Sequence, residues 1–287
     1  MSSTICRIPL LLLLVFTLLP LSVFTLLPLS VFTPAKAVQL FFQRDTTLVL
    51  NGDSVDLLFP RIHPVGEILV LPGWNFSRKK CCASSSFCST ALSKGYILIL
   101  PEMGKSVYAS RLYPETRKDW IRYPELPWVL DTLFGTLQKK FGLLKPGQNN
   151  YIFGISTGGR GVALIMENSL TLFKAGAALS GDYDQTLFPG DNLMKGVYGE
   201  FGSFRSRWEG ADNPARNAVK ITVPLYLGHG ENDKIVPCGQ SKLFFEALNS
   251  TKNPEKFKLH LSEKHGHDYA YWDSETSAVL DFFVRNR

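Results

Sequence analysis

The sequence predicts an α/β protein with a mostly parallel central sheet and helices on both faces. Six largely apolar runs of buried-strand type follow one another over residues 66–262 of the 287-residue chain, and segments with helical periodicity separate most of them. An alternating stretch at 38–61, centred on Asn51-Gly52, precedes the series and predicts an antiparallel hairpin. Because no linker or change of composition interrupts the alternation, we expect residues 38–287 to form a single domain.

The elements are predicted in chain order from this patterning. The strand-like runs rich in branched and aromatic residues lie at 66–74, 96–103, 150–156, 174–181, 221–230 and 256–262. Amphipathic periodicity predicts helices at 85–94, 123–142, 159–170, 239–250 and 274–286. Two longer irregular stretches, 104–122 and 182–219, interrupt the rhythm, and loops of this length in a compact domain usually shape or cover a site. We expect 182–219 to form a small cap.

The first 37 residues differ from the rest and are typical of a signal peptide. Arg7 supplies a positive start, a long apolar stretch follows, and the octet VFTLLPLS occurs twice in succession. The triplet Ala-Lys-Ala at 35–37 fits a signal-peptidase site, so we expect cleavage after Ala37. The sequence therefore predicts a secreted or periplasmic protein without a stable membrane anchor.

An uncleaved membrane anchor is the alternative, because the apolar stretch is long enough to span a bilayer. Prolines would interrupt such a helix at three positions: Pro20, Pro28 and Pro34. Cleavage would remove Arg7 and Lys36 and no acidic residue, which lowers the formal charge by two, from +6 to +4. A charge this small, spread along the chain, gives no reason to expect a nucleic-acid partner.

Export would place the remaining cysteines in an oxidising compartment, where pairs form disulfides. They are Cys81, Cys82, Cys88 and Cys238. Adjacent Cys81 and Cys82 are poorly placed to pair with each other. We therefore expect one of them to pair with Cys88 and the other with Cys238, against the alternative of free thiols. The spacing fits no zinc pattern, because no histidine pair accompanies it, and we expect no metal and no cofactor.

The turn GISTG has the form of a nucleophile elbow, because a predicted strand precedes it and a predicted helix follows it. Gly154 and Gly158 lie two residues before and two residues after Ser156, where so tight a turn needs small residues. Such a turn would present the Ser156 hydroxyl at the carboxyl end of the sheet. The sequence thus predicts a nucleophilic serine.

A nucleophilic serine needs a histidine as base and an acid that orients it, in the chain order serine, acid, histidine. The chain has five histidines: His63, His229, His260, His265 and His267. His63 precedes the first core strand and His260 lies within a strand, so both are expected to be structural. The base should lie between the last strand and the last helix, where His267 is favoured over His265.

The acid should follow the strand at 221–230. Asp233 lies just past the end of that strand and is the preferred candidate, with Glu231 as the runner-up. Asp182 and Asp184, which follow the preceding strand, are a second alternative. One serine, one acid and one histidine would then end three different parallel strands in the required order.

Backbone N–H groups at two positions are expected to bind the oxyanion. One belongs to Thr157, directly after the serine. The other belongs to Trp74, in the loop after the strand at 66–74, where Gly73 lets the backbone approach.

The stretch 104–123 is dense in aromatic and cationic side chains and follows a core strand, so it should lie at the same edge of the sheet. Aromatic rings would stack there on a sugar or phenolic group, and a guanidinium would bind a carboxylate. We expect four of its residues to bind substrate: Tyr108, Arg111, Tyr113 and Trp120. An ordinary solvated loop anchored by its aromatic rings is the alternative.

Together these motifs resemble the α/β-hydrolase superfamily and, within it, the esterase-D-like esterases. This group includes feruloyl esterases, acetylxylan esterases and short-chain polyhydroxyalkanoate depolymerases. The matching pieces are LPGWN at the oxyanion position, GISTGG at the nucleophile, GENDKIVP at the acid and GHDYAYW at the base. The GxSxGG and DxxVP patterns are also similar to prolyl-oligopeptidase-like and dienelactone-hydrolase-like members. The resemblance covers roughly residues 66–287 and implies the α/β-hydrolase fold.

The resemblance and the expected triad imply a secreted serine hydrolase that cleaves a carboxylic ester through an acyl-enzyme. Ser156 would attack the carbonyl while His267, oriented by Asp233, takes its proton. The substrate would be a small-molecule or polymer ester. A peptidase or acyltransferase on the same fold stays open, as does a binding protein with a lapsed site. Competent residues at all three positions favour catalysis.

Overall fold

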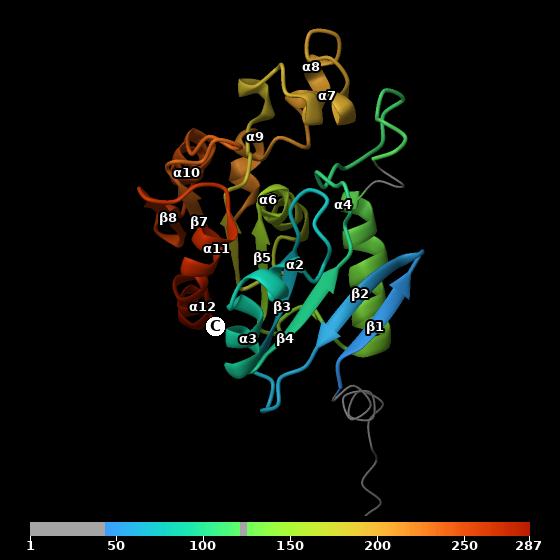
Figure 1. Cartoon of the computed structure of the whole chain (residues 1–287), viewed down its shortest axis with the longest axis vertical. Helices are drawn as coiled ribbons and strands as arrows, with labels where there is room; N and C mark the ends of the chain where they lie inside the picture. The colour runs from blue at the N-terminus through green and yellow to red at the C-terminus, as the bar shows by residue number, and fades with distance from the viewer. Residues whose placement is uncertain (1–43, 121–124) are drawn as a thin grey trace, which may run out of the picture. The chain divides into compact units, whose positions relative to one another are not determined.

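The computed structural model of the protein describes residues 44–120 and 125–287 (Figure 1). The predicted signal peptide, residues 1–37, lies outside the described residues, as does the predicted start of the hairpin. Within the two described ranges, no helix combines the length and the hydrophobicity that a membrane span requires.

A single sheet of eight strands forms the centre of the described chain, in the order β1-β2-β4-β3-β5-β6-β7-β8. The hairpin of β1 and β2 turns at Asn51-Gly52, and β2 also runs antiparallel to β4. All other neighbouring strands are parallel. The strands are β1 Thr46–Leu50, β2 Asp53–Leu58, β3 Gly66–Leu71, β4 Tyr96–Pro101, β5 Asn150–Ile155, β6 Ala175–Leu179, β7 Leu225–Gly230 and β8 Phe257–Ser262. The predicted fold class and its antiparallel hairpin are confirmed.

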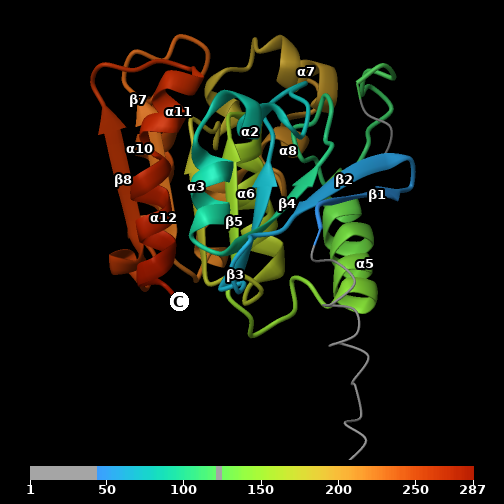
Figure 2. The ribbon, with the colours of Figure 1, turned by 60° about the horizontal axis from the view of Figure 1, so that its bottom comes forward.

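Helices cover both faces of the sheet (Figures 1 and 2). One face carries α2 Lys80–Ser84, α3 Phe87–Ser93, α11 Tyr269–Ser274 and α12 Thr276–Arg285. The opposite face carries the helical stretch α4 Glu125–Pro127, η1 Trp128–Leu133, α5 Phe134–Thr136 and η2 Leu137–Phe141, together with α6 Thr157–Ser169 and α10 Gly239–Asn249. Short helical segments complete the described chain: η3 Gln185–Leu187, α7 Asn192–Tyr198, α8 Arg205–Trp208, α9 Pro214–Asn217, η4 Ala218–Lys220 and η5 Pro254–Lys256.

The two-residue period of the strands divides the core between these faces. In β3, Ile68 and Val70 pack toward α3 and α12, whereas Leu69 and Leu71 pack toward α6 and α10. Both sets are buried, which explains why the strands read as continuous apolar runs rather than alternating ones.

The two irregular stretches meet beyond the carboxyl ends of the strands, where α7 and α8 lie (Figure 1). Val107 and Ala109 of the first stretch pack there against Met194, Val197 and Trp208 of the second. This small cluster is separate from the two core clusters and holds the two stretches together.

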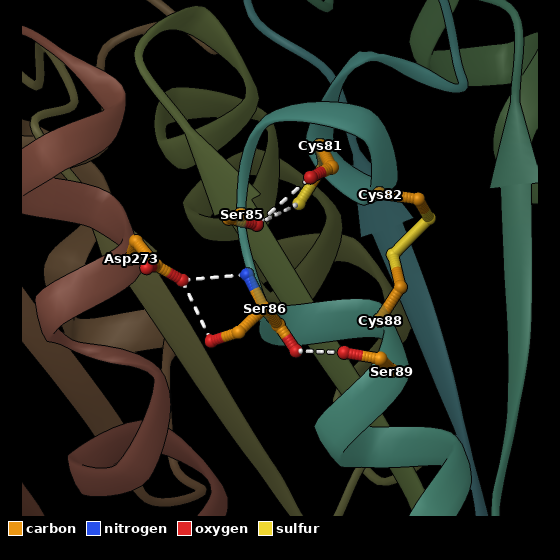
Figure 3. The surroundings of a disulfide bond; sticks show 7 residues. All are labelled: Cys81, Cys82, Ser85, Ser86, Cys88, Ser89 and Asp273. Carbon is orange, nitrogen blue, oxygen red and sulfur yellow. Dashed lines mark hydrogen bonds between the residues drawn. A yellow bond between two sulfur atoms is a disulfide. The ribbon is translucent and has the colours of Figure 1, made fainter.

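The cysteine prediction is correct for one pair and wrong for the other (Figure 3). Cys82 and Cys88 form a disulfide, whereas Cys81 and Cys238 are free. Cys81 is buried on the face of the sheet that carries α3, and Cys238 directly precedes α10, which covers the opposite face. Because the sheet separates these two thiols, the expected second disulfide does not form.

The disulfide turn is fastened to the C-terminal part of the chain (Figure 3). The backbone N–H of Ser86 and its hydroxyl both donate to Asp273 Oδ1, over 2.6 and 2.7 Å. Asp273 lies in α11, which directly follows the loop that contains His267. The turn between Cys82 and Cys88 therefore helps to hold α11 in place.

Candidate active site

Ser156 lies on a strained turn between β5 and α6, with φ 55° and ψ −126°. A non-glycine residue adopts such dihedrals only where its surroundings enforce them. The flanking glycines show how tight the packing is. A Cβ atom at Gly154 would lie 2.2 Å from the Gly158 carbonyl oxygen, and one at Gly158 would lie 2.3 Å from the Leu71 carbonyl oxygen. The GISTG turn is therefore a nucleophile elbow in its geometry.

Two hydrogen bonds join Ser156 to a histidine and an acid. His267 Nε2 lies 2.9 Å from Ser156 Oγ, and His267 Nδ1 lies 2.6 Å from Asp233 Oδ2. The three residues follow β5, β7 and β8, so three different parallel strands bring them to one edge of the sheet. The structure thus places together the serine, the acid and the base that the sequence analysis preferred.

The Asp233 carboxylate is buried and accepts four hydrogen bonds. Oδ1 accepts from the backbone N–H groups of Ile235 and Val236, and Oδ2 accepts from His267 and His229. Burial raises the pKa of Asp233, but the hydrogen bonds from the two histidines and from Val236 outweigh it and hold that pKa well below its ordinary value. Asp233 therefore stays ionised and accepts a hydrogen bond from the Nδ1–H group of His267, which leaves Nε2 to act toward the serine.

The alternative acids have other partners. Glu231 pairs with Lys242 over 3.2 Å, and Asp182 pairs with Arg160 over 2.9 Å. Asp184 caps the short helix η3 by accepting from the backbone N–H of Thr186. The alternative base, His265, bonds through Nδ1 to the Ser262 hydroxyl over 2.6 Å.

The residues expected to bind the oxyanion both lie beside the serine. Trp74 and Thr157 line the same cavity as Ser156, and a Cβ atom at Gly73 would lie only 3.1 Å from Ser156 Cβ. In the part of the chain that the structure describes, the backbone N–H groups of Trp74 and Thr157 donate to no backbone carbonyl. Both donors are therefore available to an oxygen that becomes negative near Ser156.

A cavity of about 680 Å³ opens at Ser156. Two segments form its walls: residues 182–194, which follow β6, and residues 234–240, which follow β7. The walls are mainly apolar and comprise Leu187, Phe188, Pro189, Leu193, Met194, Ile235, Val236 and Pro237. The lining also contains two glutamines, Gln185 and Gln240, and the amide groups of both form hydrogen bonds within the protein.

The four residues predicted to bind substrate do not line this cavity. Tyr108 is fully buried; its hydroxyl donates to the Pro72 carbonyl, and its ring lies against Gly161. The other three are placed as follows: Arg111 is exposed, Tyr113 packs on Tyr198, and Trp120 packs edge-on against Trp74. Tyr108 therefore supports the start of α6 rather than contacting a ligand, which corrects its assignment.

The sheet order explains this correction. Residues 104–120 follow β4, which is separated from β5 by β3, whereas residues 182–194 follow β6, the direct neighbour of β5. The second stretch therefore lies closer to Ser156. Its exposed aromatic residue Phe188 lines the cavity, while Tyr198 and Trp208 are buried in the cluster beside it.

Arg160, one turn after Ser156 in α6, connects the elbow with both irregular stretches. It is fully buried and donates to Val107 O, Asp182 Oδ2, Gln185 Oε1, Tyr198 Oη and Asp212 O. Asp182 and Gln185 line the cavity, so Arg160 fixes part of the cavity wall relative to the serine.

The fold and this arrangement define a serine hydrolase of the α/β-hydrolase superfamily. Residues 140–286 match the model of the prolyl oligopeptidase family, peptidase family S9, and the chain belongs to that family. The sequence resemblance to α/β-hydrolases, esterase-like and prolyl-oligopeptidase-like members included, is confirmed. A search of curated protein sequences gives no match.

Solved structures of similar fold are numerous, and three illustrate them. The S-formylglutathione hydrolase from Agrobacterium tumefaciens gives a TM-score of 0.69 at 15% identity, over 84% of this chain and 94% of that one. The fluorophosphonate-binding serine hydrolase F of Staphylococcus aureus, with substrate bound, gives 0.66 at 17% identity, over 84% and 99%. The Pyrococcus horikoshii acylaminoacyl peptidase gives 0.62 at 17% identity, over 85% of this chain but 41% of that longer one. At these identities the likeness concerns the fold.

Proposed function

We propose that the protein is an exported serine hydrolase that cleaves carboxylic esters through a Ser156-Asp233-His267 triad and an acyl-enzyme. One observation carries this proposal: an unbroken chain of two hydrogen bonds, 2.9 and 2.6 Å long, runs from Ser156 Oγ through His267 to Asp233 at the base of an open cavity.

The steps follow from these positions. Ser156 Oγ attacks the ester carbonyl while His267 Nε2 takes the hydroxyl proton, and the N–H groups of Trp74 and Thr157 bind the resulting oxyanion. His267 then returns the proton to the departing alkoxide, which leaves an acyl group on Ser156. Water, activated by the same imidazole, attacks the acyl-enzyme, releases the acid and restores the serine. No step calls for a metal or a cofactor.

The cavity walls favour an apolar group on the substrate, because most of their side chains are apolar. Leu187, Phe188 and Ile235 are among the few large apolar side chains that are well exposed, and all three line this cavity. Because Gln185 and Gln240 already use their amides internally, they offer little to a polar ligand. A cavity of this volume accommodates a medium-sized acyl or aryl group of a small ester, or the end of a polymer chain.

Export and the domain organisation belong to the same proposal. Residues 1–37 act as a signal peptide, and residues 38–287 act as one catalytic domain in which 182–219 covers the cavity. The disulfide between Cys82 and Cys88 supports export, because such bonds persist in oxidising compartments.

A peptidase is the second candidate, and the family match favours it. The same serine, acid and histidine would attack a peptide carbonyl, and His267 would then protonate the departing amine instead of an alkoxide. The two candidates differ in the leaving group, so a comparison of ester and amide substrates with the same acyl group separates them.

Fluorophosphonate labelling of the mature protein, with the modified residue located by mass spectrometry, tests the proposal. We expect labelling of Ser156 and its loss in Ser156→Ala, together with a decrease in ester hydrolysis of at least about 10³-fold. Ser203→Ala, at an exposed position outside the cavity lining, is the matched control and should keep both. Faster cleavage of peptide anilides than of p-nitrophenyl esters would favour the peptidase. An unlabelled, folded wild-type protein would overturn the proposal.

A further inference from the structure

A second imidazole lies beside the proposed triad and takes no part in the steps above. His229 lies in β7 and is fully buried. Its Nδ1 lies 2.7 Å from the Ser241 hydroxyl of α10. Its Nε2 lies 2.8 Å from the Val236 carbonyl oxygen and 3.2 Å from Asp233 Oδ2.

These contacts fix where the His229 proton is. A carbonyl oxygen only accepts, so His229 Nε2 must carry a hydrogen to bond Val236. The same N–H faces the Asp233 carboxylate, and Nδ1 is left to accept a hydrogen bond from the Ser241 hydroxyl. Every polar atom of this buried ring is thereby satisfied, as a stable buried imidazole requires.

We propose that His229 is a positioning residue that holds the Asp233 carboxylate in the orientation that His267 needs. The proposal rests on the proposed function. Asp233 Oδ2 is shared by the two imidazoles, and Oδ1 accepts from two backbone N–H groups, so hydrogen bonds hold both carboxylate oxygens. Through Val236 the same ring also closes the loop that carries Asp233, and through Ser241 it ties this loop to α10.

His229 acts on Asp233 through hydrogen bonds, and the titratable groups around this network are accounted for as follows. Two buried tyrosines interact with this network: Tyr183 with the Ser241 hydroxyl, and Tyr271 of α11 with the charge of Asp233. Burial raises the pKa of both tyrosines above their ordinary value, so both stay neutral. Lys234, in the same loop, is exposed. The charge that His229 contacts is therefore that of the Asp233 carboxylate, to which His229 is the second imidazole donor beside His267.

Two amide substitutions distinguish the hydrogen bonds that the His229 ring makes through Nε2 from the one that it makes through Nδ1. The side-chain nitrogen of glutamine reaches the position of Nε2, so His229→Gln keeps a donor toward Asp233 and Val236. The shorter asparagine reaches only the position of Nδ1, so His229→Asn keeps a partner for Ser241 and loses the donor to Asp233. Both variants are polar and of similar size, which makes them matched controls for each other.

We expect His229→Asn to lower kcat for ester hydrolysis about 10- to 100-fold with little change in KM, the effect of losing one hydrogen bond to a charged group. His229→Gln should recover most of the wild-type kcat. Rates are normalised to the fraction of protein that fluorophosphonate labels, so misfolded material does not count. Ser250→Ala, at an exposed position after α10 and outside the cavity lining, is the unrelated control and should change kcat by less than about threefold.

A measurement that needs no turnover keeps the inference testable if folding or activity fails. The Nδ1 proton of His267, in its 2.6 Å hydrogen bond to Asp233, should give a far-downfield proton NMR signal in the wild type and in His229→Gln, and this signal should broaden or vanish in His229→Asn. Equal kcat values in the wild type and His229→Asn, or an equal loss in both amide variants, would overturn the positioning role. An unlabelled wild type with the NMR pattern intact would instead overturn the proposed function alone.

Discussion

Replacing Arg160 with methionine should destabilise the fold far more than replacing an exposed arginine. The guanidinium is fully buried and donates hydrogen bonds to five groups from three separate parts of the chain. Methionine fills much of the same volume but offers no donor. The variant would therefore leave the Asp182 carboxylate, which is 14% exposed, without its ion-pair partner, and Gln185 Oε1 without its donor.

The magnitude follows from the cost of leaving a buried charge without its partner. Removing one member of a buried ion pair costs about 3–5 kcal/mol in the free energy of unfolding. For a chain of this size, each kcal/mol lowers the melting temperature by about 2–4 °C. The Arg160→Met variant should consequently melt roughly 6–20 °C below the wild type.

Calorimetric or circular-dichroism melting of the disulfide-intact protein measures this difference. Arg205→Met is the matched control, because the Arg205 side chain is 69% exposed and pairs with Glu209 four residues away in the chain. Such surface pairs contribute about 0–1 kcal/mol. A melting temperature of Arg160→Met within 2 °C of that control would refute the reasoning, since it would mean that water or a rearranged loop satisfies the buried carboxylate.

Two further predictions concern buried groups away from the site. Burial raises the pKa of Glu167 from its ordinary 4.5 to about 9, and neither of its carboxylate oxygens has a described hydrogen-bond partner. The folded protein therefore holds this proton more tightly than the unfolded chain does. The resulting contribution to the free energy of unfolding is fully present below pH 4.5 and is lost as the pH rises toward 9. Glu167→Gln, which is neutral throughout, should therefore resist urea better than the wild type at pH 8 but not at pH 5, and equal differences at both pH values would contradict this. The Cys82–Cys88 disulfide, with a sequence separation of 6, should contribute about 2 kcal/mol to the free energy of unfolding by restricting the unfolded chain. The double variant Cys82→Ser/Cys88→Ser should therefore melt several degrees below the wild type. A similar loss in the control Cys238→Ser, which removes a free thiol, would point to another cause.

The strands and the catalytic candidates could be read from the sequence because each depends on local pattern. A strand buried on both faces must be apolar throughout, and all six predicted core runs contain an observed parallel strand. The turn at Ser156 needs glycines two residues before and two residues after the serine, so the sequence pattern alone predicts the geometry of this turn. Asp233 and His267 were then found from their order after successive strands, which the parallel topology brings to one edge.

The cavity lining and the cysteine pairing depend on which strands are neighbours, and no local pattern records that. Tyr108 and Trp120 looked like binding residues because they follow a core strand, but β4 is not adjacent to β5. The pairing of Cys81 with Cys238 failed because the sheet lies between them. His229 received no role from the sequence, because its contacts to Asp233 and Val236 arise from the turn that follows β7.

The distribution of the site along the chain has an evolutionary consequence. Ser156, Asp233 and His267 follow core strands, whereas residues 182–194 supply a cavity wall and none of the proposed catalytic side chains. Substitutions at exposed wall positions such as Leu187 and Phe188 can therefore accumulate and change which substrates are accepted, while the reactive groups stay where they are. Arg160 limits such changes, because any replacement of this stretch must still offer hydrogen-bond acceptors to its buried guanidinium.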